Sequence, residues 1–77
     1  MDKILRALRE IHPEHDYLNS EDFIEDSLLD SFDVVILVKK LEEGYGINID
    51  GADVIPENFR NVKTIHSLIE RSADGQL

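Results

Sequence analysis

Cysteine is absent from this 77-residue chain, and its absence limits the chemistry that the chain can perform on its own. Without cysteine, the chain cannot form disulfides, thiolate metal sites or cysteine nucleophiles. Any thiol used in its function must therefore come from an attached group or from a partner.

Long apolar segments are also missing. No window approaches the roughly 20 apolar residues that a membrane span needs. The first residues, Met1-Asp2-Lys3, lack the apolar run of a secretory signal. We therefore expect a cytoplasmic protein that makes no contact with membranes.

Basic residues are scarce, with 8 Lys and Arg against 17 Asp and Glu and a formal net charge of −9. This charge density repels nucleic-acid phosphates and anionic bilayers at ordinary salt concentrations. We therefore exclude nucleic acid as a partner. We expect partners with basic surfaces. We also expect the chain itself to be a monomer.

Residue patterns typical of an enzyme are absent too. The chain has no clustered Ser/His/Asp set, glycine-rich phosphate loop or metal-ligand spacing. A domain this short buries only about 60% of the surface exposed by its unfolded chain, so a deep catalytic cavity is not expected. We predict a protein that is not an enzyme and has no metal site. The three histidines, His12, His15 and His66, are interpreted as loop or helix-surface residues.

Apolar residues recur at helical spacing through most of the chain and predict a single all-α domain over residues 1–77. The first helix should end at His12-Pro13, since proline cannot continue the helical ladder, and Gly44 and Gly46 should end the second. Asn61 is a candidate cap for the last helix. The expected helices cover about residues 2–12, 31–43, 56–60 and 62–72.

The second helix should have two apolar faces. One stripe follows the i, i+3, i+4, i+7 spacing of a core face and contains Val34, Leu37, Val38 and Leu41. A second apolar group lies outside that stripe, and acidic residues flank it. The group and its flanking residues are Phe32, Val35 and Ile36, with Lys39 between them, and Asp30, Asp33 and Glu43. This helix is either the buried centre of a bundle or carries an exposed docking patch.

The start of this helix follows a long, acidic segment, residues 13–30, whose length favours a functional role. The run from Phe23 to Val35, which contains Leu28-Leu29-Asp30-Ser31-Phe32, resembles the Asp-Ser-Leu/Met/Phe modification motif of acyl, peptidyl and D-alanyl carrier proteins. A serine at a helix start is usually only a cap. The likeness, however, continues in the same element order to the last helix.

The resemblance implies a small four-helix bundle with a long first loop and a short third helix. It also implies that 4′-phosphopantetheine from coenzyme A is attached to Ser31, flanked by Asp30. The cofactor would then supply the only thiol. The implied partners are a phosphopantetheinyl transferase, a ligase or transferase that loads the acyl or aminoacyl group, and a downstream synthase. The candidate partner contacts are Phe32, Asp33, Val35, Ile36, Lys39 and Glu43.

The cargo stays open. Fatty-acid carriers typically have an acid at the position of Ile36 and an apolar residue at that of Lys39, which favours a dedicated biosynthetic pathway here. The motif Leu28-Leu29-Asp30-Ser31 resembles one that is common in D-alanyl and aminoacyl carriers, so an amino acid is an alternative cargo. Fatty-acid, polyketide, peptide and D-alanylation pathways all remain possible.

Two other hypotheses compete with that of a carrier, and the first is a calcium-binding site. Asn48, Asp50, Gly51 and Glu57 match part of a calcium-loop pattern, but its first position would fall on Gly46, which has no side-chain oxygen. The second is an unmodified interaction adaptor that uses the docking patch alone. Loss of function in Ser31→Ala with the fold intact would favour the carrier over the adaptor.

Overall fold

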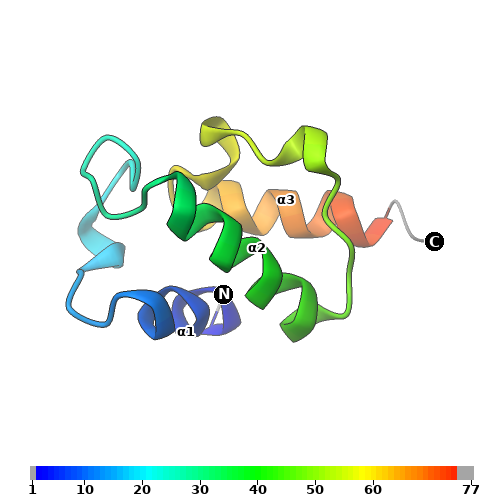
Figure 1. Cartoon of the computed structure of the whole chain (residues 1–77), viewed down its shortest axis with the longest axis horizontal. Coiled ribbons are helices and arrows are strands. Elements are labelled where there is room, and N and C mark those ends of the chain that lie inside the picture. The colour runs from blue at the N-terminus through cyan, green and yellow to red at the C-terminus, as the bar shows by residue number, and fades with distance from the viewer. Residues whose placement is uncertain (1, 75–77) are drawn as a thin grey trace.

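Residues 2–74 fold into three α-helices joined by segments that contain short 3-10 turns (Figure 1). This computed structural model describes residues 2–74. No strand occurs in that range, which confirms the predicted all-helical class. The helices are α1 (Asp2–Ile11), α2 (Ser31–Tyr45) and α3 (Val62–Asp74), and the 3-10 turns are η1 (Tyr17–Asn19), η2 (Gly51–Asp53) and η3 (Pro56–Phe59).

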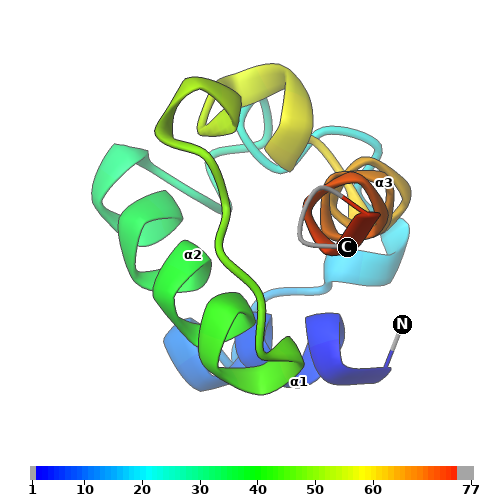
Figure 2. The ribbon, with the colours of Figure 1, turned by 90° about the vertical axis from the view of Figure 1, so that its right-hand side faces the viewer.

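The three helices surround one apolar core (Figure 2). α1 packs against both α2 and α3, and the segment that connects α2 to α3 passes along the side of the bundle. Each helix contributes fully buried aliphatic side chains at helical spacing, which is why an amphipathic sequence folds this way. These core residues include Ile4 and Leu8, Leu37 and Leu41, and Ile65 and Leu68.

The end of α2 lies two residues beyond the expected position. Gly44 is inside the helix, which continues to Tyr45 and ends at Gly46, in the left-handed region at φ 65°. Glycine adopts this conformation without the steric cost of a Cβ. Lys3, on α1, stabilises this two-residue extension of α2. Its Nζ donates to the Gly44 carbonyl at 3.2 Å and lies 5.0 Å from the centre of the Tyr45 ring.

The short third helix expected at about residues 56–60 is the 3-10 turn η3, so a fourth α-helix is not confirmed. Pro56 starts this turn, and Phe59 at its end is fully buried in the core. The turn cannot lengthen, because Asn61 caps α3 immediately afterwards. The Asn61 Oδ1 accepts the Thr64 N–H at 3.0 Å, and the Thr64 Oγ1 accepts the Asn61 N–H at 3.1 Å. The predicted cap at Asn61 is confirmed.

Apolar anchors fix the segment between α1 and α2 to the rest of the fold. Phe23 is fully buried, and its backbone N–H donates to the Arg60 carbonyl just before α3. The Asn61 side chain also donates to the Glu21 carbonyl at 3.2 Å. Leu29, two residues before α2, is 2% exposed. The residues that lead into α2 are therefore held against the core.

Tyr17 anchors the same segment to the end of α1. Its hydroxyl lies 3.2 Å from the Leu8 carbonyl and 3.1 Å from the His12 carbonyl, and its ring packs edge-on against Phe23. Burial, followed by the nearby carboxylates of Glu14 and Asp33, raises the pKa of Tyr17 above its ordinary value. The hydroxyl is therefore a neutral donor at physiological pH.

None of the helices within residues 2–74 combines the length and the apolar character needed to cross a bilayer.

Candidate functional site

Ser31 is the first residue of α2, and Asp30 is the cap of that helix. The Asp30 Oδ1 accepts the Asp33 N–H at 2.8 Å, and the Asp33 Oδ2 accepts the Asp30 N–H at 3.3 Å. The two side chains therefore form a reciprocal capping box. The sequence favours this arrangement because a short acid precedes an apolar run and a second acid follows three residues later.

This arrangement leaves Ser31 without a capping role. Its side chain is exposed, and its hydroxyl forms no hydrogen bond with any residue from 2 to 74. The capping box satisfies the N–H groups of Asp30 and Asp33, so those of Ser31 and Phe32 are left without an intrahelical partner, as at any helix start. The alternative in which Ser31 serves as the helix cap is excluded.

The surroundings of Ser31 suit an attached phosphate. Free N–H groups and the positive end of the helix dipole stabilise an anion at this position. The hydroxyl is open to solvent, so a phosphodiester on Ser31 Oγ would not displace any side chain from the core. The residues present therefore fit a phosphopantetheine group, with Ser31 as its attachment point.

The second face of α2, defined by Phe32, Val35, Ile36, Lys39 and Glu43, continues from Ser31 along the helix. Phe32 is 72% exposed and Val35 is 63% exposed, whereas Ile36 is half-buried. Lys39 and Glu43 are exposed. An exposed phenylalanine beside the serine is not explained by packing, since the core of α2 lies on the opposite side. That these residues contact a partner stays a prediction.

Asp33 does not belong to this exposed face, and here the sequence-based interpretation was wrong. Its side chain is only 12% exposed. Its carboxylate is committed to the capping box and to His12, whose Nε2 lies 3.0 Å from the Asp33 Oδ2. A charge held in this way is not available to a partner. Among the predicted acidic residues, Asp30 and Glu43 remain exposed.

His12 is the residue near the site that sequence reasoning missed. It was interpreted as a loop or helix-surface residue, but it is half-buried and contacts the capping box through Asp33. Its other ring nitrogen, Nδ1, lies 3.4 Å from the Glu14 Oε2. The contact to Asp33 spans 21 residues of sequence, and no local pattern signals it. It depends on the chain reversal between α1 and α2.

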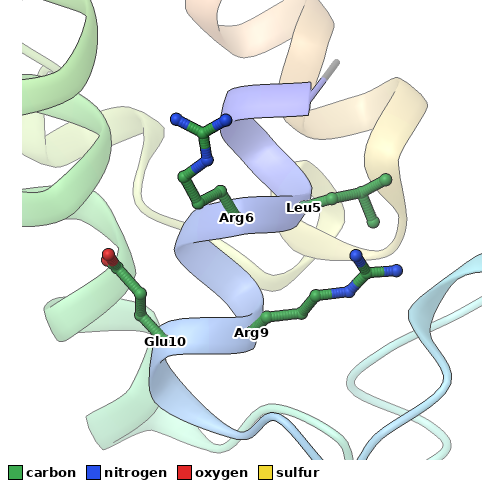
Figure 3. Close-up of a pocket in the computed structure, with 4 residues that line it drawn as sticks. All are labelled: Leu5, Arg6, Arg9 and Glu10. Carbon is green, nitrogen blue, oxygen red and sulfur yellow. The ribbon is translucent and has the colours of Figure 1, made fainter.

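A separate hollow lies on α1 and is lined by Leu5, Arg6, Arg9 and Glu10 (Figure 3). Arg6 and Glu10 point to one side of the helix, and Leu5 and Arg9 point to the other. The charged groups therefore do not converge on one ligand-sized position.

The segment around Asp50, which partly matches a calcium-loop pattern, forms hydrogen bonds within the fold. The Asp50 Oδ1 accepts the Ala52 N–H at 2.9 Å and caps η2. The Asp53 carbonyl accepts the Asn58 side-chain amide at 2.7 Å. These bonds stabilise the connection between α2 and α3, so the start of α2 remains the strongest candidate site.

Comparisons of the chain with protein-family models, with curated proteins and with solved structures find no match.

Proposed function

We propose that this chain is a carrier protein that presents acyl or aminoacyl groups as thioesters on 4′-phosphopantetheine attached to Ser31. The proposal includes a carrier-type bundle in which η3 takes the place of the short third helix. It also includes cytoplasmic location and a role without catalysis by the chain itself.

The observation that carries the proposal is the exposed Ser31 hydroxyl, free of any capping role, at the first position of a capped helix. A serine that only stabilises a helix start would be the cap, but Asp30 has that role. The Asp30-Ser31-Phe32 motif that resembles the carrier modification site therefore coincides with a hydroxyl that an enzyme can reach.

Different groups of the chain would take part in attachment of the cofactor and of the cargo. Ser31 Oγ would attack the pyrophosphate of coenzyme A, forming the phosphodiester as adenosine 3′,5′-bisphosphate leaves, and its proton would pass to the transferase, so no base is needed on this chain. The free N–H groups at the start of α2 would stabilise the phosphate. The attached group supplies a terminal thiol, which forms the thioester with the cargo. Because the chain has no cysteine, loading at that thiol would be unambiguous.

Docking would use the second face of α2. Phe32 and Val35 offer exposed apolar surface, and the chain has a net charge of −9. A partner with an apolar socket edged by Arg or Lys would complement both features. Charge attraction of this kind raises association rates and allows rapid exchange between successive enzymes.

The test is the intact mass of the chain before and after incubation with coenzyme A and a broad-specificity phosphopantetheinyl transferase. We expect a gain of one phosphopantetheinyl unit and one titratable thiol, which Ser31→Ala abolishes. Ser67→Ala is the matched control, because Ser67 is an exposed serine in the interior of α3. A chain that gains no mass with several transferases, while its fold is intact, would contradict the carrier assignment.

A second candidate function is that of an unmodified adaptor, and the exposure of Phe32 and Val35 is the observation that favours it. The two functions make opposite predictions for Ser31 and the same prediction for Phe32. Ser31→Ala abolishes the function of a carrier but leaves that of an adaptor intact, whereas Phe32→Ala weakens partner binding in both. The cellular function of Ser31→Ala therefore separates the two.

A further inference from the structure

Two histidines and a glutamate converge where the chain leaves α1. One ligand atom from each of His12, Glu14 and His15 lies within 4.8 Å of the others. The Glu14 Oε2 is central, at 3.4 Å from the His12 Nδ1 and 4.0 Å from the His15 Nε2. α1 ends at Ile11 and Pro13 follows His12, so all three residues lie on the irregular segment just after the helix.

One of these separations has the value expected for a tetrahedral zinc site, and the separation between Glu14 and His15 is wider. Zinc binds imidazole nitrogen and carboxylate oxygen at about 2.0–2.2 Å, which separates neighbouring ligand atoms by about 3.4 Å. The distance from the His12 Nδ1 to the Glu14 Oε2 already has this value. The His15 Nε2 must approach by about 0.6 Å, a small rotation for a side chain that is 28% exposed on an irregular segment.

An outer partner for the first ligand is also in place. His12 would bind the metal through Nδ1, while its Nε2 lies 3.0 Å from the Asp33 Oδ2. Metal-bound histidines commonly donate their second N–H to a carboxylate, which fixes the tautomer and orients the ring. The Asp33 side chain is 12% exposed and also accepts the Asp30 N–H in the capping box, so it offers the His12 ring a fixed partner.

We propose that His12 Nδ1, Glu14 Oε2 and His15 Nε2 bind a divalent transition cation of the zinc class, with solvent in the fourth position. Two imidazoles and one carboxylate favour zinc over calcium and magnesium, which prefer ligand sets made of oxygen. The side chains of His12 and Glu14 are 36% and 62% exposed, so an ion can enter from solvent.

A metal bound here would join α1 to the start of α2 through Asp33. The chain of contacts runs from the ion to His12, then to Asp33, and through the capping box to Asp30. Ser31 is the next residue. Occupancy would therefore restrain the position of the exposed serine without blocking its hydroxyl, and the site does not depend on whether Ser31 is modified.

The test is a calorimetric titration of Zn²⁺ into the Ser31→Ala chain without an affinity tag, in excess Mg²⁺. The Ser31→Ala background keeps a cofactor thiol from acting as a ligand, so the result is independent of the carrier proposal. We expect one zinc per chain. We also expect Co²⁺ to bind with the visible absorption of a tetrahedral site.

Ligand variants decide the location of the site. Glu14→Gln and His15→Gln should each weaken zinc binding by more than the about 10- to 100-fold that loss of an outer partner costs. His66→Gln is the matched control, because His66 Nδ1 lies 2.7 Å from the Glu70 Oε1 but belongs to no such group of three within residues 2–74. Equal losses in all three variants, several weak sites removed by Mg²⁺, or no zinc binding would each overturn the proposal.

Discussion

Asp30→Ala should destabilise the fold far more than Ser31→Ala, although the two residues are adjacent and both are exposed. Asp30→Ala removes the acceptor that lies 2.8 Å from the Asp33 N–H. Loss of an N-cap costs about 1 kcal/mol. Loss of a negative charge at a helix start costs about 0.3–1 kcal/mol more. We expect a total near 1.5 kcal/mol.

For Ser31→Ala the structure predicts a change within about 0.5 kcal/mol, because the hydroxyl has no hydrogen bond to lose within residues 2–74 and alanine favours the helix. The assay is urea unfolding followed by far-UV circular dichroism, with thermal melts as a check. A loss of about 1.5 kcal/mol lowers the melting temperature by about 6–12 °C in a domain of this size.

Asp30→Asn is the control that separates the hydrogen bond from the charge. Asparagine caps helices about as well as aspartate, so this variant should keep most of the stability. The reasoning is refuted if Ser31→Ala costs as much as Asp30→Ala, since Ser31 would then act as the cap. It is also refuted if Asp30→Ala changes the free energy of unfolding by less than about 0.5 kcal/mol.

Two further predictions concern the two faces of α2 and the anchor of the segment before it. Leu37→Ala should cost about 2.7–5 kcal/mol of unfolding free energy because Leu37 is fully buried, whereas Phe32→Ala should stay within about 0.5 kcal/mol because 72% of Phe32 is exposed. Equal losses in urea unfolding would contradict the assignment of the faces. Tyr17→Phe should cost about 1 kcal/mol, because its hydroxyl hydrogen-bonds at the end of α1, and a melt unchanged from that of the parent would show that the bond contributes nothing.

The core faces of the helices could be predicted from the sequence because they depend on spacing alone. Val62, Ile65, Leu68 and Ile69 recur at helical spacing in the last helix, and all four are buried. The same logic identified the core of α2, where Leu37 is fully buried. Amphipathic periodicity is a local property, so it is visible before any tertiary contact is known.

What the sequence did not predict depends on contacts between distant segments. α2 continues past Gly44 because Lys3 reaches the last turn from α1. Asp33 is buried because His12, 21 residues away, faces its carboxylate. The grouping of His12, Glu14 and His15 was missed because their order in the chain matches no familiar ligand spacing. Asp30 and Ser31 are both residue types that cap helices, and the acid at Asp33, three residues after Asp30, favours Asp30, which the backbone angles and hydrogen bonds of the structure identify as the cap.

The bonds that fix Phe23 and Glu21 beside the start of α3 divide the connection between α1 and α2 into two shorter spans. Of residues 12–30, only residues 24–30 separate the anchored Phe23 from Ser31. Because the entropic cost of loop closure grows with the logarithm of loop length, a span of seven residues in place of nineteen lowers that cost by about 0.9 kcal/mol. Only a short segment therefore joins the start of α2 to the anchored Phe23. If Ser31 carries a cargo, the distance over which that cargo travels must come from the attached arm and not from the loop.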